Sequence, residues 1–304
     1  MKRLLFSFFI ITIHLGLVNA QAIDSILPVE KTLLWEISGN GLDSTSFLFG
    51  TIHLIEASNF VIKPKLEKAF SDVSRVTFEI NMEDMTDPAL MITLMTKIFM
   101  PNDSTLEDLV TEQEYQQIEE FFKNGELALP MAMIKKIKPA FLSMMDPSAL
   151  SGGGLDESTV SYELKIFEKC QLDHKKVDGL ETIEFQIGLF DQIPLKTQAE
   201  MLVHTVQEVK DSTQENTLKK LTEIYLQEDI NGMQKMMDVD APEMMGIGED
   251  LLANRNSKWI PIMGKMMKEQ KTLFAVGAGH LGGEKGVIAL LRKAGYKVRP
   301  VMSE

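Results

Sequence analysis

The chain has 304 residues and carries 44 acidic against 31 basic side chains, which gives a formal net charge of −13. This acidic balance argues against nucleic acid and against anionic membrane surfaces as partners. A chain of this length can bury a large core without disulfides, and its single cysteine, Cys170, has no partner for an internal one. Its place in a helical pattern favours a half-buried structural thiol over a nucleophile.

The first twenty residues are typical of a secretory signal peptide. Lys2 and Arg3 precede an apolar stretch that is shorter than a bilayer span, and Val18-Asn19-Ala20 offers a cleavage site. We therefore predict an exported protein, periplasmic or secreted, with no stable membrane insertion after cleavage. Residues 21–304 would form a single mature domain.

The predicted elements then follow in chain order. Strand-like runs at residues 33–37 and 45–50, joined by Ser38-Gly39-Asn40-Gly41, predict a β-hairpin. A helix is predicted over residues 63–72 and a strand over 75–80. Residues from about 88 to 150 are helical in character, with a capping box at Thr111–Glu114 and a stop at Asn124-Gly125. A break at Gly152-Gly153-Gly154 precedes a helix starting at Asp156 and a strand over 176–180.

A second helical block is predicted from about residue 190 to 256. The chain then shows a strand at 272–276, a glycine-rich turn, a helix at 284–294 and a strand at 296–301. This alternation predicts an α/β fold with a central, mostly parallel or mixed sheet, flanking helices, and a parallel, right-handed final β-α-β unit. The blocks at about 88–150 and 190–256 are predicted to form a helical cap or insertion over the sheet.

Two Gly-x-x-His turns, one near each end of the chain, are the strongest functional signal. Gly50-Thr51-Ile52-His53 and Gly277-Ala278-Gly279-His280 each follow an apolar, strand-like run. Glycine at a strand exit allows a sharp turn and close approach to a ligand, and ligands of open α/β sheets bind at the carboxyl ends of the strands. If the two strands are parallel neighbours, about 4.8 Å apart, both histidines can reach one site.

Glu79 is the natural third member of this site, because it closes the strand that follows the one bearing His53. Two histidines and one carboxylate are a common ligand set for a catalytic metal ion. An exposed strand end is an equally good reading of Glu79 from the residues alone. Arg255, before Trp259, either supplies a cation for an oxyanion or caps a helix end.

Two other patterns are less favoured. Gly277-Ala278-Gly279-His280-Leu281-Gly282 also satisfies the dinucleotide motif G-x-G-x-x-G, but too little chain follows for a nucleotide-binding half. The twenty methionines admit copper binding, yet no array of methionines interleaved with histidines accompanies them, which favours core packing.

Taken together, these motifs resemble the TraB/GumN family, which includes bacterial pheromone-shutdown proteins and the animal Tiki proteins. The residues that carry the resemblance, in order, are Leu33-Leu34-Trp35, Phe47 to Leu54, Glu79, Gly154-Leu155-Asp156, Gly179 to Thr182 with Gln186, Arg255-Asn256 with Trp259, Val276 to Gly286, and Gly295 to Val298. The paired G-x-x-H with an intervening glutamate is the specific part.

The resemblance implies roles for particular residues. Tiki proteins are manganese- or cobalt-dependent metalloproteases, which implies His53, His280 and Glu79 as metal ligands here, with Glu79 alternatively the general base. A more distant similarity to erythromycin-esterase-like hydrolases, which work without a metal, implies a functional role for Arg255. Asp156 and Glu181 are candidates to orient the imidazoles.

Three hypotheses follow. The first is an exported hydrolase dependent on a divalent ion (Mn, Co or Zn), most simply a peptidase. The second is a metal-free ester or amide hydrolase with His53 as base. The third is a protein that binds a peptide or other ligand without cleaving it. The partner would be a peptide or small-molecule substrate, and the sequence leaves the oligomeric state open.

Overall fold

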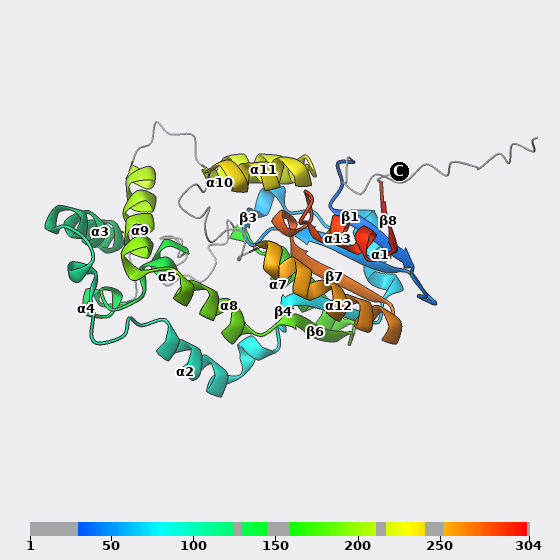
Figure 1. Ribbon diagram of the computed structural model, residues 1–304, viewed down its shortest axis with the longest axis horizontal. Coiled ribbons are helices and arrows are strands. Elements are labelled where there is room, and N and C mark those ends of the chain that lie inside the picture. The colour runs from blue at the N-terminus through cyan, green and yellow to red at the C-terminus, as the bar shows by residue number, and fades with distance from the viewer. Residues whose placement is uncertain (1–29, 125–128, 145–158, 211–216, 241–251, 303–304) are drawn as a thin grey trace, which may run out of the picture.

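The computed structural model describes residues 30–124, 129–144, 159–210, 217–240 and 252–302. Its centre is a mixed six-stranded sheet in the order β6-β4-β7-β2-β1-β8, flanked by helices (Figure 1). This confirms the predicted α/β fold. The six strands are β1 (Leu34–Gly39), β2 (Ser46–Thr51), β4 (Arg75–Ile80), β6 (Lys176–Glu181), β7 (Thr272–Gly277) and β8 (Tyr296–Pro300).

Strand β7 lies near the middle of the sheet and pairs in parallel with both β2 and β4. Strand β6 extends the parallel part beyond β4, whereas β1 runs antiparallel to both β2 and β8. Four parallel strands therefore end at the same edge. β8 runs in the same direction as β7, as predicted for the final β-α-β unit, but β2 and β1 separate the two strands.

The predicted hairpin between β1 and β2 is present. Gly39, Asn40 and Gly41 at its tip have φ angles of +76°, +48° and +76°, in the left-handed region that glycine and asparagine tolerate best. The turn sets Leu34 opposite Phe49. It therefore fixes where β2 ends and where the first Gly-x-x-His turn begins.

The main hydrophobic core surrounds the apolar strand β7. It includes side chains from α1 (Pro64–Asp72), α7 (Tyr162–Leu172), α12 (Asn254–Glu269) and α13 (Val287–Lys293). Helix α13 is shorter than predicted at its start, because Gly283, with φ +75°, forms a turn first. Cys170 is fully buried rather than half-buried, and this burial raises its thiol pKa to about 12.

The parts of the helical blocks that share a second hydrophobic cluster form a lobe beside the carboxyl edge of the sheet, whereas Tyr225, Ile230 and Met233 of the second block pack into the main core (Figure 1). Residues of α3, α5 and α9 share a second hydrophobic cluster, so the two blocks pack on one another. The helices of the blocks are α2 (Pro88–Lys97), α3 (Glu112–Asn124), α4 (Met131–Ile134), α5 (Pro139–Met144), α8 (Ile183–Leu189), α9 (Leu195–Lys210), α10 (Thr217–Leu226) and α11 (Ile230–Asp240).

The predicted signal peptide, the glycine break at 152–154 and Asp156 lie outside the described residues. Within the residues that are described, no helix combines the length and the apolar character that crossing a membrane requires.

Candidate active site

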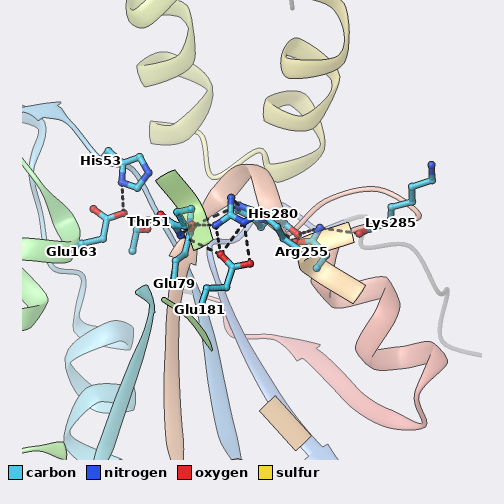
Figure 2. A network of polar contacts seen from close by, with 11 residues as sticks. Thr51, His53, Glu79, Glu163, Glu181, Arg255, His280 and Lys285 are labelled. Atoms are coloured by element: carbon cyan, nitrogen blue, oxygen red, sulfur yellow. Dashed lines mark hydrogen bonds and ion pairs between the residues drawn. The ribbon is translucent and has the colours of Figure 1, made fainter. Parts of the chain in front are cut away.

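The predicted site residues come from the carboxyl edge of the parallel strands. Glu79 and Glu181 stand at the ends of β4 and β6, while His53 and His280 follow β2 and β7. Arg255, from the first turn of α12, reaches the same edge (Figure 2). The parallel pairing of β2 with β7 sets Thr51 beside Gly277, so both Gly-x-x-His turns leave the sheet at the same level.

His280 is held in a fixed orientation. Its Nδ1 lies 2.6 Å from Oδ1 of Asn256, and the amide nitrogen of Asn256 donates to the carbonyl oxygen of Lys285 at 2.9 Å. Because that amide nitrogen is committed to carbonyl oxygens, Oδ1 is the acceptor and the proton is assigned to Nδ1 of His280. The ring of Trp259 packs against the imidazole with its centre 4.5 Å away. The Nε2 lone pair of His280 is thereby aimed at the site.

Glu79 faces that lone pair across 3.6 Å, the distance from its Oε1 to Nε2 of His280. Oε1 also accepts the backbone N–H of Gly277 at 2.9 Å. Oε2 accepts from Arg255 Nη2 at 2.6 Å and from Gln186 at 3.2 Å. Burial alone would raise the pKa of Glu79, but the charges of the neighbouring basic groups outweigh it and lower the pKa to about 2. Glu79 is therefore an ionised carboxylate and a weak base.

Arg255 is the cation that balances two buried carboxylates. Besides contacting Glu79, its Nε donates to Glu181 at 2.9 Å, and its Nη1 lies 3.4 Å from Nε2 of His280. The guanidinium also stacks over Trp259, 5.1 Å from the ring centre. Glu181 thus orients Arg255, whereas the sequence suggested that it would orient an imidazole.

The two histidines have opposite electrostatic surroundings. Burial lowers the pKa of His280 to about 4, although the Glu79 carboxylate pulls the other way, so His280 is neutral at neutral pH. His53 is 78% exposed at the side chain, and its Nδ1 lies 3.0 Å from Oε1 of Glu163. That hydrogen bond raises the pKa of His53 to about 9 against the effect of desolvation.

Three residues that lacked an assigned role join the site: Glu163, Asn256 and Gln186. Asn256 and Gln186 are neighbours in sequence of Arg255 and Glu181, and this proximity is the signal that could have identified them. Glu163 had no such signal. It follows Ser161, whose side chain caps α7, so the segment has the appearance of an ordinary helix start.

His53, His280 and Glu79 are residue types that bind divalent ions, and the positions of His280 and Glu79 also suit a shared ion. Ligands with bonds of about 2.1 Å and a tetrahedral angle lie about 3.4 Å apart, close to the 3.6 Å between His280 Nε2 and Glu79 Oε1. Both histidines have the outer hydrogen-bond partner that metal-bound imidazoles usually have. His53 stands apart, and no three His, Cys, Asp or Glu side chains converge within the described part of the chain.

Comparison with known proteins identifies the same family as the sequence motifs. The model of the TraB/PrgY/gumN family matches residues 33–300. Metalloprotease TIKI2 of Xenopus tropicalis is 21% identical over 316 residues, and metalloprotease TIKI1 of Homo sapiens is 22% identical over 320. Each alignment covers 88% of this chain but only about three fifths of the relative, 59% and 61% respectively. No solved structure matches.

Proposed function

The chain belongs to the TraB/PrgY/gumN family, and on that premise we propose that it is an exported, metal-dependent hydrolase that cleaves peptides. His280, Glu79 and His53 would hold a divalent ion, Mn²⁺, Co²⁺ or Zn²⁺. The observation that carries this proposal is the pair formed by His280 Nε2 and Glu79 Oε1, which face one another at 3.6 Å at the carboxyl edge of the sheet.

A bound divalent ion would supply Lewis-acid polarisation of the scissile carbonyl and a water of lowered pKa. The protein groups prepare that chemistry. Asn256 keeps the proton of His280 on Nδ1, and burial keeps the ring neutral, so Nε2 carries a lone pair that a ligand would take in place of its 3.4 Å contact with Arg255 Nη1. Arg255 and the Gly277 N–H hold Glu79 as an oriented carboxylate. With a pKa of about 2, Glu79 suits the role of ligand better than that of general base.

One observation favours a second candidate, the metal-free hydrolase. The Arg255 guanidinium already places positive charge 2.6 Å from Glu79 and 3.4 Å from His280 Nε2. In that mechanism Arg255 would stabilise the developing oxyanion. His53, whose pKa the hydrogen bond to Glu163 raises to about 9, would accept a proton only in the fraction of molecules in which its imidazole is neutral, so activity would rise with pH. Whether cleavage depends on a bound metal ion decides between the two candidates.

The test measures metal content and peptide cleavage on one preparation. Purified protein is analysed for Mn, Co and Zn, treated with a chelator, and incubated with a mixed peptide library read by mass spectrometry. We expect cleavage that is lost on chelation and restored by one of the three ions. His280→Gln and Glu79→Gln should lower cleavage by 100-fold or more, on the order of the loss of a metal ligand.

Glu168→Gln is the matched control, because Glu168 lies exposed on α7 and pairs with Lys165, away from the site. It should cleave at the wild-type rate. Chelator-resistant cleavage would replace the first candidate with the metal-free one. Saturable peptide binding with no cleavage under any metal would contradict both and identify a binding protein.

A further inference from the structure

The first Gly-x-x-His turn contacts a buried carboxylate, that of Glu163. Its Oε1 accepts the hydroxyl of Thr51 at 2.6 Å and lies 3.0 Å from Nδ1 of His53. Its Oε2 accepts the hydroxyl of Ser161 at 2.9 Å. Thr51 and His53 belong to the same Gly-x-x-His turn, so one carboxylate is bound by two side chains of that turn (Figure 2).

A small second sheet brings the two segments together. Immediately after His53, strand β3 (Ile55–Glu56) pairs antiparallel with β5 (Thr159–Val160), which leads directly into Ser161 and α7. Ile55, opposite Val160, is buried, with 2% of its surface exposed. This pairing fixes the distance between the Gly-x-x-His turn and the first turn of α7, so the contact between His53 and Glu163 is built into the fold.

The contact selects one ring nitrogen of His53. Since Nδ1 is held by Glu163, Nε2 is the nitrogen turned to solvent, and it becomes available to a ligand or a reacting group when the ring gives up its Nε2 proton. The side chain of His53 is largely exposed whereas the residue Glu163 is only 8% exposed, so the buried member is the fixed one. A buried carboxylate needs such partners to offset its desolvation, and here it receives three.

From this geometry we infer that Glu163 is a positioning residue that presents Nε2 of His53 to the site. It does for the first Gly-x-x-His turn what Asn256 does for His280 in the second. This inference rests on the proposed function only in taking His53 as a working member of the site. Nothing in the sequence around Glu163, the second residue of α7, indicates this role.

Two variants test the role. Glu163→Ala removes the acceptor, while Glu163→Gln keeps an oxygen that can accept from Nδ1 and from Thr51, together with nearly the same shape. We expect the affinity for Mn²⁺ or Co²⁺, measured by titration calorimetry, to fall about 10- to 100-fold in Glu163→Ala and less in Glu163→Gln. Glu168→Gln, on the same helix, should bind as the wild type does.

A readout on the metal-free protein separates this inference from the proposed function. The Nδ1–H proton of His53 should give a downfield imidazole resonance, recorded at low temperature to slow its exchange with water, that disappears in His53→Gln. It should persist in Glu163→Gln and vanish in Glu163→Ala, with the thermal unfolding temperature of both variants recorded to exclude loss of the fold. Persistence of the resonance in Glu163→Ala would overturn the inference. If the wild type binds no metal but the resonance follows this order, the metal proposal fails and the positioning role of Glu163 stands.

Discussion

Arg255 is buried between two carboxylates, and its removal would leave both without their main counter-charge. The side chains of Arg255, Glu79 and Glu181 are 10%, 14% and 6% exposed. Breaking a buried ion pair from one side is strongly destabilising because an uncompensated charge remains. The interaction is also bidentate in character, so lysine cannot replace the arginine.

We therefore expect Arg255→Met, which keeps most of the side-chain volume, to lower the free energy of unfolding by about 3–5 kcal/mol in urea titration. Arg299→Met, at an exposed position of β8, is the control and should change it by about 0.5 kcal/mol or less. Adding Glu181→Gln to Arg255→Met should recover part of the loss, since one unpaired charge is removed. Equal effects of Arg255→Met and Arg299→Met would show that the carboxylates do not depend on this cation.

His53 stabilises the folded protein to a degree that depends on pH, and its pKa gives the direction of that dependence. Its pKa in the folded protein, about 9, lies above the ordinary value of 6.5, chiefly because of the hydrogen bond to Glu163. The folded state therefore binds this proton more tightly than the unfolded state does. The resulting stabilisation is complete below about pH 6.5 and is lost as the pH rises through about 9. Its size is modest, because the imidazole is largely exposed and its pairing is screened by solvent.

The measurement is the thermal unfolding temperature of wild type and His53→Gln between pH 6 and 10. The difference between them should be largest at the acid end and should shrink towards pH 9–10. In a Glu163→Gln background the same substitution should show a much weaker trend, because the carboxylate charge is gone. A difference that stays constant or grows with pH would contradict the assigned pairing.

At the scale of elements, the exit of β7 is shaped so that a carboxylate can approach the backbone. A Cβ added at Gly277 would stand 3.2 Å from Oε1 of Glu79 and 3.7 Å from Cδ2 of His280. The glycine thus leaves room for the hydrogen bond from its own N–H to Glu79. A side chain here would displace the carboxylate relative to His280 by a few tenths of an ångström.

We expect Gly277→Ala to lower kcat/KM for peptide cleavage about 10-fold or more, because small displacements of catalytic groups are costly. The accompanying loss of stability should be about 1–3 kcal/mol, the usual cost of overpacking. Gly188→Ala is the matched control. It lies in α8 with no atom within 4 Å of the added Cβ, so activity should be unchanged and stability slightly raised. Equal activity of the two variants would contradict the role given to the strand exit.

The sequence predicted the elements that carry the site better than the contacts between them. The two Gly-x-x-His turns and Glu79 were recognisable because apolar runs and glycines mark where strands end, and parallel strands end at one edge. The partner of His53 was not predictable, because it depends on a β3–β5 pairing of two residues on each side, about 100 positions apart. Likewise, whether Glu181 binds an imidazole or Arg255 depends on side-chain geometry that spacing does not encode.

At the scale of the whole molecule, the described residues form two hydrophobic clusters. One surrounds the sheet, and the other joins α3, α5 and α9 from the two helical blocks. The blocks leave the sheet at its carboxyl edge, after β4 and β6, so the lobe is attached on the side of the candidate site (Figure 1). A lobe with its own core can unfold while the sheet stays folded, because proteins unfold locally in cooperative, separately packed units.

Leu202 on α9 is fully buried in the second cluster, which makes it the site for testing this division. Leu202→Ala should remove about 2–5 kcal/mol from the stability of the lobe through the cavity it creates. In native-state hydrogen exchange, amides of α3, α5 and α9 should then lose protection, while those of β2, β4 and β7 keep it. Leu273→Ala, at an equally buried position of β7, should instead lower protection in the sheet. If the sheet of Leu202→Ala loses as much protection as the lobe, the two clusters unfold as one unit. The lobe beside the site could then not change its structure independently of the sheet.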